Sequence, residues 1–294
     1  VPKKLVVVGG GYIGLEMGSV WSRLGSDVQV VEFLDHITPG MDKEISTEFQ
    51  KLLKKQGINF NLKTKVESIS KNNNGVTINT SDDQGNKKQF DCDVVLISVG
   101  RKPNTKGLNL NKVGVETDEK GRIKVNKKFQ TNIKNIYAIG DVIEGPMLAH
   151  KAEEEGIAVA ELISGQSGHV NYEVIPSVVY TTPEVASVGK TEEQLKEKNI
   201  KYKIGKFPFM ANSRAKAIDE PDGFVKILAD ATTDKVLGVH LIGPHAGELI
   251  AEMAIAMEFG ASSEDIARTC HAHPTFSEAV KEAALSVEKR QIHS

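Results

Sequence analysis

A glycine-rich turn between two apolar runs restricts the fold of the N-terminal part most strongly. Residues 5–8 (LVVV) form a short apolar run. Glycines then follow at the spacing GxGxxG, as Gly9, Gly11 and Gly14. An amphipathic stretch comes next, and a second apolar run covers residues 27–32. This order predicts strand, tight turn, helix and strand, the first unit of a doubly wound Rossmann-type α/β domain.

Each glycine in this spacing has a physical role. The first permits a tight turn, the second lets a pyrophosphate approach the backbone, and the third allows close helix–strand packing. Glu32 lies eighteen residues after Gly14, where a carboxylate can accept hydrogen bonds from a ribose 2′-hydroxyl and repel a 2′-phosphate. The pattern therefore favours NAD over NADP. The alternative is a turn that serves packing only, with Glu32 as a solvated strand end.

Size, charge and cysteine content exclude several classes of function. The 294 residues suffice for two domains, or for one large and one small domain. With 37 Lys and Arg against 39 Asp and Glu, no overall field favours nucleic acid or a membrane surface as a partner. Cys92 and Cys270 form no metal or redox spacing, which predicts buried thiols in a reducing compartment and no metal site. The chain starts almost directly on a strand, which suggests a missing upstream part.

The pattern after residue 40 alternates strands and helices. Asp42 precedes an amphipathic stretch that Gly57 should end. Residues 58–80 indicate short strands with a turn at Asn74-Gly75, and residues 93–98 (DVVLIS) indicate another strand.

The remaining residues fall into two regions. Residues 101–171 are less regular, with an expected strand at 136–141 and a helix at 149–164. Residues 172–294 alternate strands and helices as an α+β domain would. The helix expected at 247–260 is apolar on most of its circumference, so it needs cover from its own domain or from another subunit.

A histidine-rich stretch, HAHPTFSE, occupies residues 271–278. His273 precedes a proline and should lie in an extended loop before a helix that starts near Thr275. Glu278 has two possible roles: it could fix the tautomer of His273, or complete a capping box with Thr275. The residues alone favour neither role, and both are compatible. His271 is expected to make structural hydrogen bonds.

Several stretches together resemble one family, the dihydrolipoamide dehydrogenases. These are the flavoprotein E3 components of 2-oxoacid dehydrogenase complexes, within the pyridine nucleotide–disulfide oxidoreductases. The matching stretches are VGGGYIGLE (8–16), SVGRKPNT (98–105), IYAIGDV (136–142), GPMLAHKAEEEG (145–156), KFPFMANSRA (206–215) and HAHPTFSE (271–278).

The resemblance implies three domains and two cofactor sites. Residues 1–103 would be the NAD-binding domain, 104–171 the C-terminal part of an FAD-binding domain, and 172–294 the interface or dimerisation domain. The implied NAD positions are Gly9, Gly11, Tyr12, Ile13, Gly14, Leu15, Glu16, Glu32, Val66 and Gly100. The implied FAD positions are Asp141, Met147, Leu148, Ala149 and His150. Without the resemblance, Val66 would be strand core, Gly100 a simple turn and Asp141 a cap.

The resemblance also implies an activity and a partner. His273 and Glu278 match the acid–base pair that serves a dithiol bound at the partner subunit of a homodimer. The implied reaction oxidises dihydrolipoyl groups of 2-oxoacid dehydrogenase complexes through a disulfide and FAD to NAD, in the mitochondrial matrix or alternatively a bacterial cytoplasm.

The sequence departs from the family at its start. It lacks the family's first GxGxxG and the CxxxxC redox pair, so it looks like the C-terminal part of such an enzyme and is expected to be inactive alone. The alternatives are an NAD-binding dimerisation module without catalysis, and a glutathione-type reductase, which Glu32 disfavours.

Overall fold

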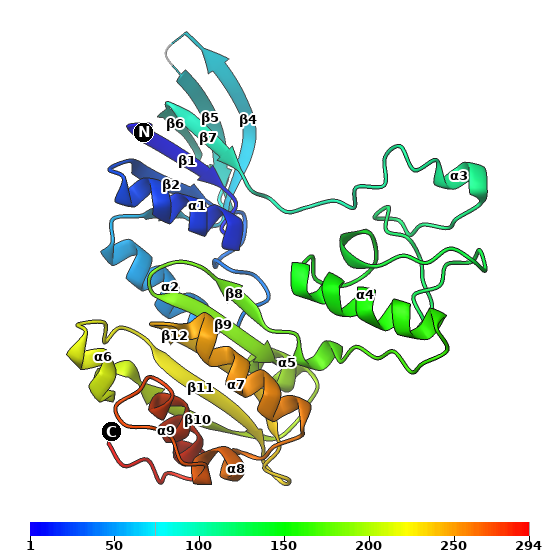
Figure 1. Cartoon of the computed structure of the whole chain (residues 1–294). Coiled ribbons are helices and arrows are strands. Elements are labelled where there is room, and N and C mark those ends of the chain that lie inside the picture. Colours follow the sequence, from blue (N-terminus) through cyan, green and yellow to red (C-terminus); the bar gives the residue numbers. More distant parts are fainter. Residues whose placement is uncertain (74, 294) are drawn as a thin grey trace. The chain divides into compact units, whose positions relative to one another are not determined.

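The computed structural model describes residues 1–73 and 75–293 and divides into two compact units (Figure 1). The larger unit comprises Val1–Val99 and Glu173–Ser294, and the smaller unit comprises Gly100–Tyr172. The arrangement is mixed α/β with parallel and antiparallel sheets, as expected. The three domain boundaries inferred from the sequence stay a prediction.

The N-terminal part of the larger unit is built on a four-stranded parallel sheet. Its strands, in spatial order, are β3 (Asn59–Asn61), β2 (Asp27–Val31), β1 (Lys4–Val8) and β7 (Val94–Ile97). Helix α1 (Tyr12–Arg23) joins β1 to β2, and α2 (Lys43–Lys55) joins β2 to β3. This confirms the strand, turn, helix and strand order predicted from the glycine spacing. Helix α2 confirms the amphipathic helix expected after Asp42, and Asp42 caps it by accepting a hydrogen bond from the Glu44 amide.

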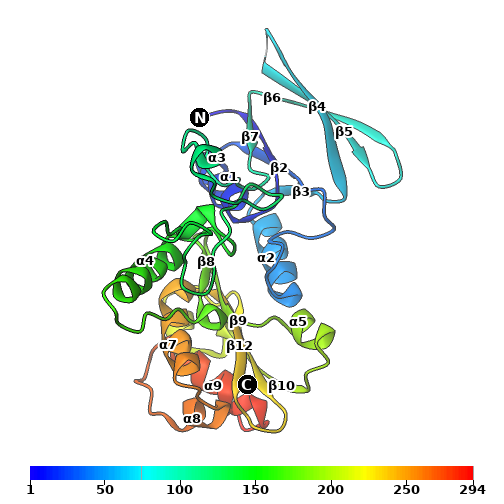
Figure 2. The ribbon, with the colours of Figure 1, turned by 90° about the vertical axis from the view of Figure 1, so that its right-hand side faces the viewer.

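A small antiparallel sheet interrupts this parallel arrangement before β7, as predicted. It consists of β4 (Thr64–Asn72), β5 (Gly75–Asp82) and β6 (Lys87–Cys92) (Figure 2). The turn predicted at Asn74-Gly75 includes Asn74, which lies outside the described residues.

The C-terminal part of the larger unit is built on a five-stranded antiparallel sheet. The spatial order is β10 (Tyr202–Pro208), β11 (Phe224–Asp230), β12 (Val236–Gly243), β9 (Glu184–Gly189) and β8 (Ser177–Val179). Its helices are α5 (Glu192–Glu197), α6 (Ser213–Ala217), α7 (Ala246–Glu258), α8 (Ser263–Arg268) and α9 (Glu278–Val287), with 3-10 turns at Tyr172–Val174 and Phe209–Ala211.

Both faces of this antiparallel sheet are covered. Val225 and Ile227 of β11 belong to the core cluster that includes residues of α7 and α9. Phe224, which points to the opposite face of the same strand, belongs to the cluster that includes Phe49 of α2. The apolar helix predicted at 247–260 is α7, which buries Leu249, Ile250 and Met253 within its own unit and leaves Ile255 exposed.

The smaller unit contains little regular structure. Its helices are α3 (Leu110–Val113) and α4 (Ala149–Ile163), with a 3-10 turn at Gly140–Val142. Helix α4 confirms the helix expected at 149–164, but the strand expected at 136–141 was wrong. Tyr137 forms only an isolated bridge with Gln130, and Gly140 turns the chain with a φ of +71°. An apolar run needs a partner along its length to become a strand, and the described part of this unit offers none.

A buried ion cluster lies where α2 packs on the antiparallel sheet. The Nζ atom of Lys226 in β11 lies 3.0 and 3.1 Å from the carboxylate oxygens of Asp42 and 2.7 Å from Glu192, and the side chains of Lys226 and Asp42 are fully buried. Burial opposes ionisation of Glu192, but hydrogen bonds from Lys196, Lys226 and Tyr202 bring its pKa to about 2.

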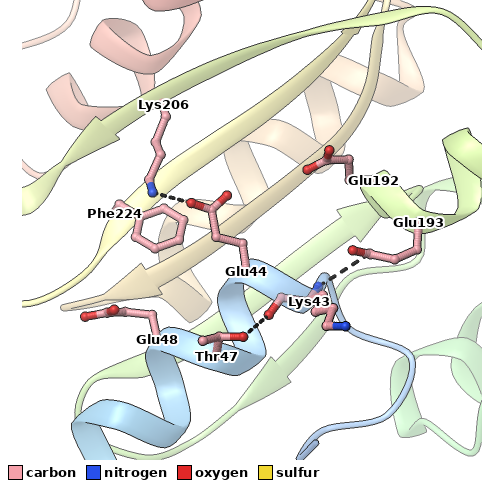
Figure 3. Close-up of a pocket in the computed structure, with 8 residues that line it drawn as sticks. All are labelled: Lys43, Glu44, Thr47, Glu48, Glu192, Glu193, Lys206 and Phe224. Carbon is pink, nitrogen blue, oxygen red and sulfur yellow. Dashed lines mark hydrogen bonds and ion pairs between the residues drawn. The ribbon is translucent and has the colours of Figure 1, made fainter.

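Figure 3 shows a pocket that Glu192 of this cluster lines together with Glu44, Lys206 and Phe224 among others. The volume of this pocket is about 360 Å³. Lys206 pairs with Glu44 there, and its ammonium lies 3.9 Å from the centre of the Phe224 ring.

Candidate functional site

The glycine turn after β1 combines two tightly packed glycines with one that is open. A Cβ atom on Gly9 would lie 2.5 Å from the Ser98 carbonyl oxygen, and the φ of Gly9 is +109°. A Cβ atom on Gly14 would lie 2.6 Å from Ser98 Oγ and would also collide with the Gly9 carbonyl oxygen. In contrast, no heavy atom lies within 4 Å of the Cβ position of Gly11. The first and third glycines are therefore needed for packing, and the second leaves room for a ligand.

The N-terminus of α1 is suited to an anion. Gly11 is its N-cap residue, no side chain caps the helix, and its first turn contains no acidic residue. The amide groups of a first helical turn lack intrahelical partners and carry the positive end of the helix dipole. A phosphate group fits such a position.

The other residues predicted on this helix have different surroundings. Tyr12 is exposed and Ile13 is half-buried, whereas Leu15 is fully buried in the core. Glu16 accepts a hydrogen bond of 2.8 Å from the amide of Tyr180, so it connects α1 to the segment after β8.

Glu32 is buried directly after β2, with 9% of its surface exposed, so its interpretation as a solvated strand end was wrong. Oε2 accepts a hydrogen bond of 2.5 Å from the Gly10 amide, and Oε1 accepts one of 2.8 Å from the Leu34 amide. Two backbone amides thus orient the carboxylate beside the glycine turn. Because an ionised carboxylate can accept about four hydrogen bonds, acceptor capacity remains for a hydroxyl ligand. Gly10, which the sequence reasoning missed, permits this approach.

Val66 and Gly100, which were also predicted around NAD, have different surroundings from the glycine turn and Glu32. Val66 lies in β4 and packs on the cluster that contains Val6, Val8 and Val31. Gly100 belongs to the smaller unit and has a φ of +111°.

In the smaller unit, Asp141 lies in the 3-10 turn, with its side chain about half exposed and 3.5 Å from Arg101. A buried ion pair holds the turn in place. Glu155 accepts a hydrogen bond of 2.7 Å from the Gly140 amide and lies 2.9 Å from Lys151, which donates to the Gly140 carbonyl. The sequence reasoning missed this pair, although a lysine and a glutamate four residues apart in a helix are a detectable signal.

The segment from Met147 to His150 leads into α4. Met147 and Leu148 are half-buried, and Ala149 and His150 are exposed. Leu148 is the N-cap residue of α4, whose first turn has neither a side-chain cap nor an acidic residue. All five residues predicted to contact FAD are therefore in one compact unit, and the four from Met147 to His150 lie at the N-terminus of α4, which fits a negatively charged group.

His273 and Glu278 form a hydrogen-bonded pair. His273 Nδ1 lies 2.9 Å from Glu278 Oε1, and Glu278 Oε2 accepts a hydrogen bond of 2.8 Å from the Thr275 amide. Glu278 therefore contacts both expected partners, one through each carboxylate oxygen, but the expected capping box was wrong, because Thr275 is not the N-cap residue of α9. Burial opposes ionisation of Glu278, but the Thr275 amide and His273 keep its pKa below the ordinary value.

The surroundings of the pair leave the histidine open to a reactant. The His273 side chain is 68% exposed, against 21% for Glu278, so Nε2 is available to a ligand. The expected helix start at Thr275 was wrong: α9 begins at Glu278, and the Thr275 hydroxyl donates to the Ala272 carbonyl instead.

The two cysteines differ in environment. Cys92 at the end of β6 is buried, and burial raises the pKa of its thiol. Cys270 is exposed because it follows the end of α8 in a loop, so its expected burial was wrong. Across residues 1–73 and 75–293, no group of three or more His, Cys, Asp or Glu residues is arranged to hold a metal ion. Within the same described residues, no helix has the length and apolarity needed to cross a bilayer.

Known proteins resemble this chain over its whole length. It is 61% identical to dihydrolipoyl dehydrogenase, mitochondrial, of Pisum sativum, and the match covers 100% of this chain and 59% of the relative. It is 61% identical to leghemoglobin reductase of Glycine max (97% of this chain, 55% of the relative) and 58% identical to dihydrolipoyl dehydrogenase, mitochondrial, of Dictyostelium discoideum (100% and 61%). The chain thus spans about three fifths of the length of these relatives.

Solved structures share the fold. LpdA of Mycobacterium tuberculosis has a TM-score of 0.87 at 28% identity, covering 96% of this chain and 61% of that one. The Cu(II) complex of the HOCl-induced flavoprotein disulfide reductase RclA of Escherichia coli has a TM-score of 0.88 at 29% identity, covering 96% and 64%.

Two family models account for most of the sequence. Residues 1–156 match the pyridine nucleotide-disulphide oxidoreductase model, and residues 175–284 match the dimerisation domain of the same proteins. The glycine turn, the Asp141 turn and the His273–Glu278 pair all lie within these matches. The chain belongs to the pyridine nucleotide-disulphide oxidoreductase family.

Proposed function

We propose that the full-length protein containing this chain oxidises dihydrolipoyl groups of 2-oxoacid dehydrogenase complexes and passes the electrons through a disulfide and FAD to NAD. The observation that carries the proposal is the His273–Glu278 pair, in which Nδ1 is held by a carboxylate and the exposed ring presents Nε2. The match of the whole chain to proteins named dihydrolipoyl dehydrogenase supports the substrate class.

In this proposal, His273 is the general base for the dithiol. A thiolate, not a thiol, attacks a disulfide, so a thiol proton must be removed before exchange. Nε2 of His273 accepts that proton and returns it in the reverse direction. Glu278 holds Nδ1 through the 2.9 Å hydrogen bond, which fixes the ring orientation and stabilises the imidazolium that forms.

We assign NAD binding to the glycine turn and Glu32. The open Cβ position of Gly11 and the uncapped N-terminus of α1 would receive the pyrophosphate, and Glu32, oriented by two amides, would accept a ribose hydroxyl. We also assign Tyr12, Ile13, Leu15, Glu16, Val66 and Gly100 to positions around NAD.

We assign the flavin positions to the smaller unit. Asp141 would hold the ribityl chain, and Met147, Leu148, Ala149 and His150 would lie along the flavin. When bound, flavin and nicotinamide supply the electron and hydride transfer, and the residues named here supply their placement.

The assembly proposed is a homodimer, because residues 175–284 match a dimerisation-domain model. The dithiol at one subunit would then be served by His273 of the other. We propose the mitochondrial matrix as the location, with a bacterial cytoplasm as the alternative, because relatives at about 60% identity are named mitochondrial.

The test uses His273→Ala in the full-length protein. We expect the rate of NAD-dependent dihydrolipoamide oxidation to fall at least about a hundredfold, the range typical for loss of a general base. Oxidation of NADH by ferricyanide, which needs no dithiol, should continue at the unaltered rate. Dihydrolipoamide turnover equal to that of the unaltered protein would reject the assignment, and turnover of NADPH with glutathione disulfide would favour the glutathione-type reductase.

A further inference from the structure

The loop that carries His273 contains a second histidine with the opposite environment. The segment between α8 and α9 covers residues 269–277, and we call residues 269–275 of it the histidine loop. His271 has only 5% of its side chain exposed, against 68% for His273. The proposed proton transfer makes no use of His271, so its burial requires another explanation.

Both ring nitrogens of His271 contact oxygen atoms that can only accept hydrogen bonds. Nε2 lies 2.7 Å from Oε1 of Glu252 in α7, and Nδ1 lies 3.0 Å from the carbonyl oxygen of Thr269. The ring is thus held at both of its nitrogens, by α7 on one side and by the start of the histidine loop on the other.

The charged groups around this arrangement come from two helices. Glu252 comes from α7 and contacts Nε2 of His271. Lys281 from α9 donates a hydrogen bond of 2.9 Å to the same Thr269 carbonyl oxygen that His271 contacts. The start of the histidine loop is thereby tied to both helices through side chains.

The end of the histidine loop is tied differently. The Thr275 amide donates to Glu278, and the Asn212 side chain donates to the Thr275 carbonyl at 2.9 Å. His273 lies between these two attachments, next to Ala272, whose carbonyl accepts the Thr275 hydroxyl. Its ring position therefore depends on the attachment at His271 as well as on Glu278.

We propose that His271 is a positioning residue: held between Glu252 and the Thr269 carbonyl, it fixes the histidine loop on α7 and so places His273 for proton transfer. A displacement of about 1 Å at a reacting group can lower a rate by as much as about a hundredfold. We therefore expect loss of this attachment to lower dithiol oxidation by about tenfold to a hundredfold.

The kinetic test, which rests on the proposed function, compares His271→Gln with Glu252→Gln and the double variant in the full-length protein. Glutamine can occupy one of the two contacts but carries no charge. Each single variant should lower kcat for dihydrolipoamide oxidation with little change in KM and should keep the ferricyanide rate. The double variant should be no slower than the slower single variant, because both changes remove the same attachment.

The matched control is His293→Gln. His293 also pairs with a glutamate, Glu282, at 2.7 Å, but it lies after α9 and is not part of the histidine loop. It should leave both rates unchanged. If His271→Gln lowers the dihydrolipoamide and ferricyanide rates in parallel, or lowers neither, the positioning role is overturned.

A second measurement does not depend on the reaction. Hydrogen exchange of the full-length protein should show faster exchange of the amides of the histidine loop in His271→Gln and in Glu252→Gln than in the unaltered protein, and no change in His293→Gln. Unchanged exchange of this loop in His271→Gln would refute the inference. If His273→Ala keeps full dithiol turnover while the loop exchanges faster in His271→Gln, the proposed function fails and the attachment of the loop by His271 stands.

Discussion

Replacement of Lys226 tests how α2, which follows the glycine-turn strands, is held on the antiparallel sheet. The change Lys226→Met keeps much of the side-chain length but removes a fully buried ammonium group that contacts Asp42 and Glu192. Asp42 is then left buried and without its counter-charge. Breaking one side of a buried ion pair costs about 3–5 kcal/mol, because the remaining charge stays desolvated.

The magnitude can be measured locally by hydrogen exchange of the full-length protein. A loss of about 3–5 kcal/mol corresponds to exchange faster by about two to three and a half powers of ten, since about 1.4 kcal/mol is tenfold at 25 °C. The increase should be confined to amides of α2, β11 and α5, whose residues meet in the cluster. Amides of α7 and α9, on the other face of the sheet, serve as the internal reference.

The double variant Lys226→Met/Asp42→Asn separates buried charge from lost packing. Asparagine still accepts the Glu44 amide hydrogen bond as an N-cap but leaves no unpaired charge. The double variant should therefore exchange more slowly than Lys226→Met alone. Unchanged exchange in Lys226→Met, or faster exchange in the double variant, would refute the electrostatic reasoning.

Further predictions concern acid stability and the nucleotide site. The pKa of Glu192 in the folded protein is about 2, against an ordinary 4.5. Its ionised form therefore contributes roughly 3 kcal/mol to the free energy of unfolding above about pH 4.5, and this contribution is lost as the pH falls towards 2. Urea titrations between pH 2 and 6 should show a shallower pH dependence of the free energy of unfolding for Glu192→Gln than for the unaltered protein. Gly14→Ala should lower the free energy of unfolding by about 1–3 kcal/mol through overpacking against Ser98 Oγ. Gly11→Ala should leave the free energy of unfolding unchanged but weaken NADH binding, measured by calorimetry, at least about tenfold. A stable Gly14→Ala protein would contradict the packing argument. Glu32→Gln should reduce the preference for NADH over NADPH, and an unchanged ratio of dissociation constants would exclude Glu32 from the ribose site.

Sequence patterns predicted those elements of the fold whose formation depends on residues close together in the chain. The apolar run at residues 5–8, the glycine spacing and the amphipathic stretch after Asp42 each depend on residues close in sequence, and each formed the strand, turn or helix predicted from it. The strand expected at 136–141 did not form, because a strand needs a partner along its length and Tyr137 has only an isolated bridge to Gln130.

Side-chain contacts show the same difference between residues close in sequence and residues far apart in sequence. The His273–Glu278 pair spans five residues and was foreseeable, although the sequence could not show that each oxygen of Glu278 serves a separate role. The contact of Lys226 with Asp42 spans 184 positions and has no local signal. The approach of Gly10 to Glu32 likewise depends on how β1 and β2 align in the sheet.

The proton-transfer role of His273 can be measured most directly in a single turnover. The oxidised full-length protein, as His273→Ala and unaltered, is mixed with dihydrolipoamide in the absence of NAD, and flavin absorbance is followed by stopped flow. We expect His273→Ala to be reduced by the dithiol at least about a hundredfold more slowly, and by NADH at the unaltered rate. Equal rates of reduction by dihydrolipoamide in the two proteins would contradict the proposed role of the His273–Glu278 pair.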